Sequence, residues 1–206
     1  MPRVKPVPRD QATPEIRRLY EQMFGDRDPV TDPGTSTGTP GNWWTVWANV
    51  PGILAAFSAF PAAQATLDPG LRELALVRCG YARASLFVFS QHCKAARRVG
   101  VAAEKVEAVP YWTIADCFTP IERAVLAYTD GLVLEDGRVH DRVFAALKAE
   151  LSDAHILMLT YQINMYSLHA TATKALRLEY DDLPDRMVEI PAPATPGVAD
   201  WRRTPE

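Results

Sequence analysis

Two residues suited to proton transfer, Glu73 and His92, lie in the stretch 71–100. The residues one helical turn from His92 are the apolar Val88 and Ala96, so we expect the imidazole to face inward. A histidine titrates near neutral pH, and a carboxylate partner can fix its tautomer and tune its basicity. A histidine and a carboxylate that meet could therefore move protons. The alternatives are a histidine that simply packs in the core and a glutamate in a first helical turn that only favours the helix dipole.

Two helices, over 71–83 and 86–99, are predicted to position these side chains. Ser85 between them is a good N-cap, because its hydroxyl can accept a hydrogen bond from an unpaired backbone N–H. Its alternative role is to donate to a substrate oxygen at a helix N-terminus, a position that favours anions. Val88 has no reactive group and is predicted to line the substrate site. Gly100 ends the second helix, since glycine tolerates positive φ.

The spacing of these residues resembles that of a known family, the carboxymuconolactone decarboxylase and alkylhydroperoxidase-D-like proteins, whose peroxidases carry Glu-x11-Cys-x2-Cys-x3-His across such a helix pair. Glu73 and His92 hold the outer positions, while Ser85 and Val88 stand where the two cysteines would be. The resemblance extends more loosely over 51–178. It implies an all-α bundle of about seven helices, no cofactor, and a homo-oligomer (dimer, trimer or hexamer).

The three cysteines, Cys79, Cys93 and Cys117, form no C-x-x-C pair. An odd number at unrelated spacings predicts thiols in a reducing cytoplasm. Cys93 follows His92 directly, but adjacent helical residues point about 100° apart, so a Cys–His dyad is not expected.

Composition and motifs exclude several classes of function. The net charge is −3, from 22 Lys and Arg against 25 Asp and Glu, and no basic cluster suggests a nucleic-acid partner. The chain has no run of about 18 apolar residues, so no membrane span is predicted, and MPRVKPVPRD is not a secretory signal. His155 and His169 are too far apart on one helix to share a metal ion, and no zinc motif or glycine-rich phosphate loop is present.

The rest of the chain is predicted to be helical, with no convincing strand. We expect three parts: an arm, helix and Trp-rich segment over 1–50, the helical domain over 51–180, and a Pro-rich tail over 181–206. The segment 25–41 is predicted to be a loop. The clearest helix starts are expected at Thr13-Pro14, at the capping box Thr119–Glu122, and at Ser152.

Three tryptophans, Trp44, Trp47 and Trp112, are candidates for a wall of the substrate site, because aromatic side chains commonly line ligand pockets. Trp43 shares a helical face with Trp47, and Asn42 is predicted to cap their helix. The alternative for the Trp-rich segment is core or subunit packing.

The function predicted from these residues is that of a cofactor-free lyase or decarboxylase acting on a small organic acid or lactone. His92 would supply the proton, Glu73 would orient it, and the helix start at Ser85 would hold a carboxylate or oxyanion. Two alternatives stay open. One is an alkylhydroperoxidase-like antioxidant protein, inactive or using a single cysteine (Cys79 or Cys93). The other is a non-catalytic binding or assembly protein.

Overall fold

The computed structural model describes residues 2–34, 41–59 and 67–178. Every regular element in those ranges is a helix, which confirms the predicted all-α class. None of these helices is long and apolar enough to cross a membrane. The predicted tail over 181–206 and part of the predicted loop lie outside the described residues.

The described residues form nine α-helices, slightly more than the seven or so that the family resemblance implied. The helices are α1 Pro14–Phe24, α2 Gly41–Trp47, α3 Pro51–Ala59, α4 Pro69–Ala82, α5 Leu86–Arg98, α6 Ala103–Ala108, α7 Pro120–Val133, α8 Asp141–Glu150 and α9 Asp153–Leu176. There are also two short 3-10 helices in these ranges: Arg9–Gln11 precedes α1, and Val109–Tyr111 follows α6.

The helix starts follow local side-chain chemistry. Thr13 accepts a hydrogen bond from the backbone at the start of α1, Ser152 does so for α9, and Thr119 and Glu122 form a reciprocal capping box on α7. The predicted starts are confirmed at these three places. The prediction for α2 was wrong, because that helix begins at Gly41 and so includes Asn42.

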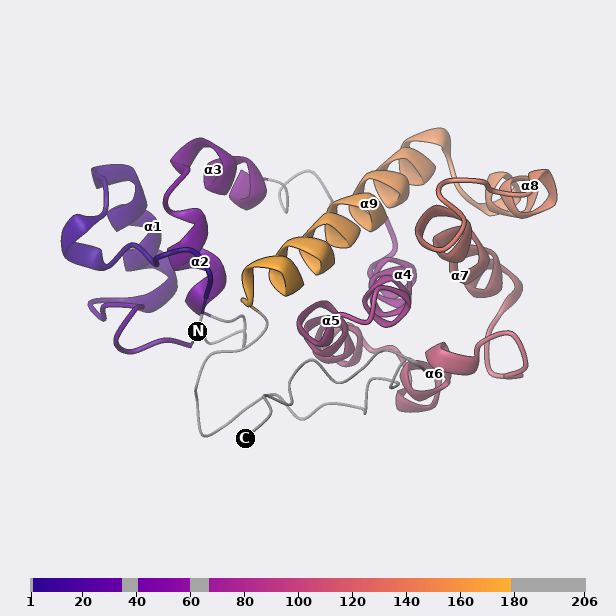
Figure 1. Cartoon of the computed structure of the whole chain (residues 1–206). Helices are drawn as coiled ribbons and strands as arrows, with labels where there is room; N and C mark the ends of the chain where they lie inside the picture. Colours follow the sequence, from indigo (N-terminus) through magenta and orange to yellow (C-terminus); the bar gives the residue numbers. More distant parts are fainter. Residues whose placement is uncertain (1, 35–40, 60–66, 179–206) are drawn as a thin grey trace, which may run out of the picture.

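The helical hairpin of α4 and α5 forms the centre of the molecule, with α9 lying across it and α7 and α8 beside it (Figure 1). A close approach holds the hairpin together. A Cβ on Gly80 would lie 2.5 Å from the backbone nitrogen of Phe89, so only glycine fits. The corner uses Ala84 at a φ of 49°, and the next residue, Ser85, caps α5.

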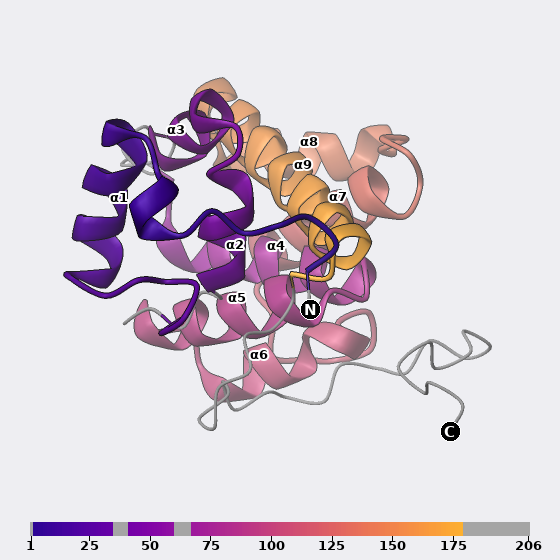
Figure 2. The same cartoon turned by 60° about the vertical axis from the view of Figure 1, so that its left-hand side comes forward.

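The first three helices lie on the opposite side of α9 from α7 and α8, as Figures 1 and 2 both show. Trp43 of α2 joins them to the central hairpin, because its ring stacks on Phe87 of α5 at 5.9 Å between centroids. The N-terminal arm adds two backbone hydrogen bonds, from Val7 to Thr45 and from Arg3 to Leu176.

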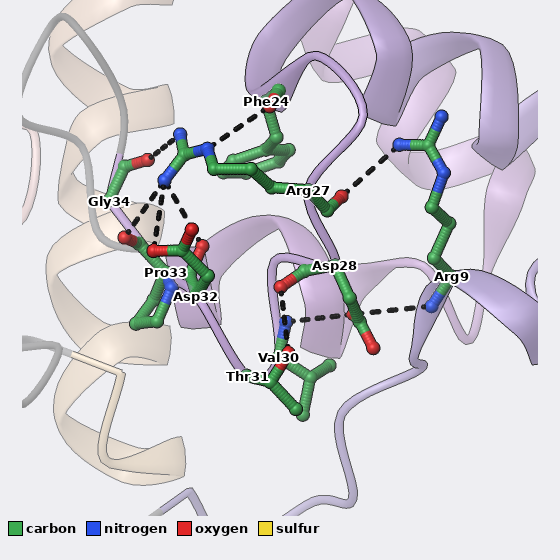
Figure 3. Close-up of polar contacts among 9 residues, drawn as sticks. All are labelled: Arg9, Phe24, Arg27, Asp28, Val30, Thr31, Asp32, Pro33 and Gly34. Carbon is green, nitrogen blue, oxygen red and sulfur yellow. Dashed lines mark hydrogen bonds and ion pairs between the residues drawn. The ribbon is translucent and has the colours of Figure 1, made fainter.

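Arg27 organises the described part of the predicted 25–41 loop (Figure 3). Its guanidinium donates to the carbonyl oxygens of Phe24 and Gly34 at 3.1 and 2.9 Å and to the Asp32 carboxylate at 3.3 Å. Asp28 accepts from the backbone of Arg9 at 3.3 Å, which ties the loop to the arm. The loop is thus closed by side-chain hydrogen bonds to backbone, the usual device where no regular structure satisfies the carbonyls.

Candidate functional site

Glu73 of α4 and His92 of α5 face each other inside the hairpin. The Oε2 atom of Glu73 lies 2.7 Å from Nδ1 of His92, and both side chains are only 5% exposed. The helices run antiparallel, so residues that are 19 positions apart in sequence meet across the interface. The structure therefore brings together the two residues predicted to act as a pair.

Arg72 holds the other oxygen of the carboxylate, with 2.9 Å between its Nε and Oε1 of Glu73. Burial acts to raise the pKa of Glu73, but the hydrogen bond and charge of His92, followed by those of Arg72, outweigh it and lower the pKa. The ionised carboxylate accepts, so Nδ1 of His92 carries the proton. In the neutral ring Nε2 is then the basic nitrogen.

The Nε2 atom of His92 is buried and has no hydrogen-bond partner within the described part of the chain. A buried polar atom without a partner is costly, and native structures keep few of them. The side chain thus has one nitrogen fixed by an acid and the other available, which is the arrangement that proton transfer needs.

Ser85 and Val88, both predicted to touch substrate, are buried at the start of α5. The Ser85 hydroxyl accepts from the backbone N–H of Val88 at 3.3 Å, as the capping prediction required. Val88 packs in one apolar cluster with Trp43 and Phe87. Both residues therefore support the helix that carries His92, and their predicted contact with substrate stays a prediction.

Tyr166 and His169 of α9 lie beside the pair, and the sequence reasoning missed them as site residues. The Tyr166 ring is edge-on to His92 at 4.2 Å between centroids, and His169 lies 5.1 Å from Tyr166. Trp43 at 4.5 Å and Phe57 at 4.9 Å pack against His169 in turn. The spacing of Tyr166 and His169 places them on one face of a helix, but the sequence does not show which other helix that face contacts.

These surroundings set the charge state of both α9 side chains. Burial, with a smaller contribution from the charge of His92, lowers the pKa of His169 to about 4, so this imidazole is neutral at pH 7. Burial and the charge of Glu73 raise the pKa of Tyr166 to about 12, despite an opposing effect of Arg72. The site therefore combines one acid–base pair with neutral hydrogen-bonding groups.

The three tryptophans that were predicted to line the substrate site do not lie together in the structure. Trp47 packs edge-on against Phe57 at 5.4 Å and belongs to the aromatic group that includes His169, and Trp44 packs in the same region of the core. Trp112 lies elsewhere. Its indole N–H donates to Asp130 at 3.0 Å, and Asp130 is the partner of the buried Arg78 at 2.6 and 2.9 Å.

Comparison with known protein families finds a match in the central part of the chain. Residues 43–131 match the sequence model of the carboxymuconolactone decarboxylase family, a range that includes Glu73, Ser85, Val88 and His92. The chain is therefore similar to this family over these residues. No curated protein matches the chain at a significant level.

Solved structures share the fold at low identity. A protein of unknown function from Agrobacterium tumefaciens, described as a putative antioxidant defence protein AhpD, is 22% identical, with a TM-score of 0.54 over 65% of this chain and 92% of its own. A variant of the debrominase Bmp8 in complex with 2,3,4-tribromopyrrole is 18% identical, with a TM-score of 0.66 over 87% and 92%. An uncharacterized peroxidase-related protein from Ralstonia eutropha, an alkylhydroperoxidase AhpD core, is 19% identical, with a TM-score of 0.65 over 87% and 95%. These likenesses confirm the expected fold.

The thiols of this chain do not lie at the two cysteine positions of the peroxidases that it resembles, where Ser85 and Val88 stand. Cys79 and Cys93 are buried, Cys117 is half-buried, and none of the three is in a disulfide. Burial raises the pKa of Cys79 to about 12, against a smaller lowering by Arg83. Such a thiol is protonated at neutral pH and is a poor nucleophile.

In the described ranges, no group of three or more histidine, cysteine, aspartate or glutamate side chains is placed so that it could hold a metal ion. His155 lines an open surface pocket of about 570 Å³ at the starts of α4, α7 and α9, together with Asp68, Glu122 and Glu150. His169 lies instead on the inner side of α9, beside Tyr166.

Proposed function

We propose that the protein is a cofactor-free lyase of the decarboxylase type, acting on a small organic acid or lactone, in which His92 moves the proton and Glu73 orients it. The observation that carries the proposal is the buried His92 ring, with Nδ1 bound to a carboxylate and Nε2 left without a partner. A histidine held in this way is suited to general acid–base work near neutral pH.

The reaction balances without a further reactant. Breaking the bond to the carboxylate carbon releases CO2 and leaves the electron pair on the substrate as an enolate. The protonated Nε2 of His92 then delivers its proton to carbon, and the ring recovers a proton from solvent. Glu73 stays ionised throughout, because its lowered pKa keeps it an acceptor for the Nδ1 hydrogen. Its role is to hold the tautomer and stabilise the charged ring.

Small carboxylated lactones and β-keto acids are the substrates to screen, and the debrominase complex with a brominated pyrrole supports a small ring as ligand of such a fold. Turnover in D2O followed by proton NMR reports the proton step directly, because deuterium enters the product at carbon. His92→Ala should reduce turnover by about 10²- to 10⁴-fold, the usual contribution of an acid–base group. His155→Ala on the surface pocket is the matched control and should leave the rate unchanged. A His92→Ala protein that keeps its turnover would contradict the proposal.

A non-catalytic binding protein on the same fold is the second candidate. It is favoured by the neutral, buried His169, whose Nε2 has no partner among the described residues and which lies beside Tyr166, the neighbour of His92. It predicts ligand binding with no deuterium incorporation. A one-cysteine peroxidase is less well supported, because the pKa of the Cys79 thiol is raised to about 12.

We also propose that the protein is a cytoplasmic homo-oligomer. Three large apolar or aromatic residues of α9, Leu157, Tyr161 and Leu168, are 70%, 58% and 50% exposed, and they follow one another along one face of the helix. A second copy of the chain would remove this surface from water. None of the three cysteines is in a disulfide, which suits a reducing compartment.

A further inference from the structure

The inner face of α9 carries polar side chains where a packed core would have apolar ones. Gln162, Tyr166 and His169 follow at i, i+4 and i+7, so they share one face of the helix. Gln162 is fully buried and His169 is 7% exposed. Tyr166 contacts the His92 ring, so this face is turned toward the proton-transfer pair.

Three polar atoms of this face have no partners among the described residues. Both amide atoms of Gln162 and Nε2 of His169 are buried without a hydrogen bond, as is Nε2 of His92. Such groups lower the stability of a fold, and an apolar residue of similar size would serve packing better. Their presence together on one side of the site indicates that something polar binds there.

The charges around this face limit what that can be. Two arginines reach the region, and both are engaged, Arg72 with Glu73 at 2.9 Å and Arg83 with Ser167 at 2.8 Å. A ligand with two negative charges would bury an uncompensated charge, which is strongly unfavourable. A protonated His92 can balance one negative charge, while the glutamine amide and a neutral imidazole suit uncharged donors and acceptors.

The apolar neighbours of these side chains are aromatic rings. Trp43 and Phe57 pack against His169, and Tyr166 packs between the two histidines. Flat rings make favourable edge-to-face and offset contacts with such side chains.

We propose that Gln162 and His169 recognise a flat ring compound that is neutral or carries one negative charge. They would bind its polar substituents and so place its reacting end at His92. The inference rests on the proposed function, since it takes His92 as the reacting group. It adds two binding residues and a charge limit on the substrate.

The test uses the full chain and two matched ligands. 4-Hydroxybenzoate has one carboxylate and a hydroxyl on a flat ring, and isophthalate has two carboxylates on the same ring. Calorimetry should show that 4-hydroxybenzoate binds at least about tenfold more tightly than isophthalate, and it should shift the nitrogen-15 signals of His92 and His169. Absence of 4-hydroxybenzoate binding at millimolar concentration, or equal affinity for the two, would overturn the inference.

Variants separate recognition from packing. His169→Phe keeps an aromatic ring among Trp43 and Phe57, and Gln162→Met keeps the side-chain length. Each should weaken 4-hydroxybenzoate binding at least about tenfold while leaving Tm unchanged or higher, because a costly buried polar group is removed. His155→Phe, elsewhere on α9, is the control and should bind normally. Normal binding by both His169→Phe and Gln162→Met would overturn the inference.

The outcome is distinguishable from failure of the proposed function. If His92→Ala abolishes turnover while His169→Phe and Gln162→Met bind normally, the acid–base role stands and this inference fails. If the two α9 variants lose binding but His92→Ala keeps full turnover, recognition by α9 stands and the proton-transfer role fails.

Discussion

Breaking the Glu73–His92 pair should cost more stability than the loss of one contact. The two side chains are 2.7 Å apart and each is 5% exposed, so removing one leaves the other charged group buried. His92→Phe preserves a ring against Tyr166 but leaves Glu73 with only Arg72 as a charged partner. We expect this change to lower the free energy of unfolding by about 3–5 kcal/mol, the usual effect of orphaning a buried charge.

Glu73→Gln should cost less, roughly 1–3 kcal/mol, because the amide oxygen can still accept from Nδ1 of His92. The double variant, with Glu73→Gln and His92→Phe, should lose less than the sum of the single losses, by about 0.5–3 kcal/mol, because each change removes the same interaction. Urea unfolding followed by circular dichroism at pH 7 measures all three quantities.

Acid provides the independent check. The pKa of Glu73 is lowered in the folded protein, so the unfolded chain binds the proton more readily than the folded one. The stability from this carboxylate is therefore fully present above its unfolded pKa, near 4.5, and is lost as the pH falls through the lower folded value. The difference in free energy of unfolding between wild type and Glu73→Gln should thus be largest at pH 7 and should disappear in stronger acid. Two results together would refute the reasoning: losses of stability that add in the double variant, and a difference between wild type and Glu73→Gln that does not change with pH. Packing alone would then explain the stability.

Three further predictions concern the scaffold. Arg78→Leu leaves the carboxylate of Asp130 without its bidentate partner and should cost about 3–5 kcal/mol in urea unfolding, with Arg78→Lys a poor substitute because it cannot bond in fork geometry. Gly80→Ala forces a Cβ into the backbone of α5 and should lower Tm strongly, whereas Gly52→Ala meets nothing within 4 Å and should gain roughly 0.5–1 kcal/mol. Leu168→Glu, on the exposed face of α9, should lower the mass seen by sedimentation if that face joins two copies, and an unchanged mass would argue against that interface.

Local chemistry made part of this structure predictable. The caps Thr13, Ser85 and Ser152 act within one turn of chain, so the helix starts could be read from sequence. The pairing of Glu73 with His92 was expected from the motif spacing of the resembled family, and the short corner of the helical hairpin brings the two residues together. Both features depend only on residues near one another in the chain.

Contacts between distant helices were not predictable in the same way. Tyr166 meets His92 only because α9 crosses the hairpin at one particular register, and side-chain spacing on α9 does not specify that register. The place of Trp112 beside Asp130 depends likewise on how the chain before α7 folds back.

Both sides of α9 carry side chains that do not suit an isolated protomer. Its inner side buries Gln162 and His169 with polar atoms unpaired, and its outer side exposes Leu157 and Leu168. Each arrangement opposes the hydrophobic effect for an isolated, empty protomer. A polar ring compound on the inside and a second copy of the chain on the outside would relieve both. Because one continuous helix carries both sides, a change that moves α9 at the outer contact would also move His169 relative to His92. Assembly and ligand recognition are therefore expected to be linked through this helix rather than to vary independently.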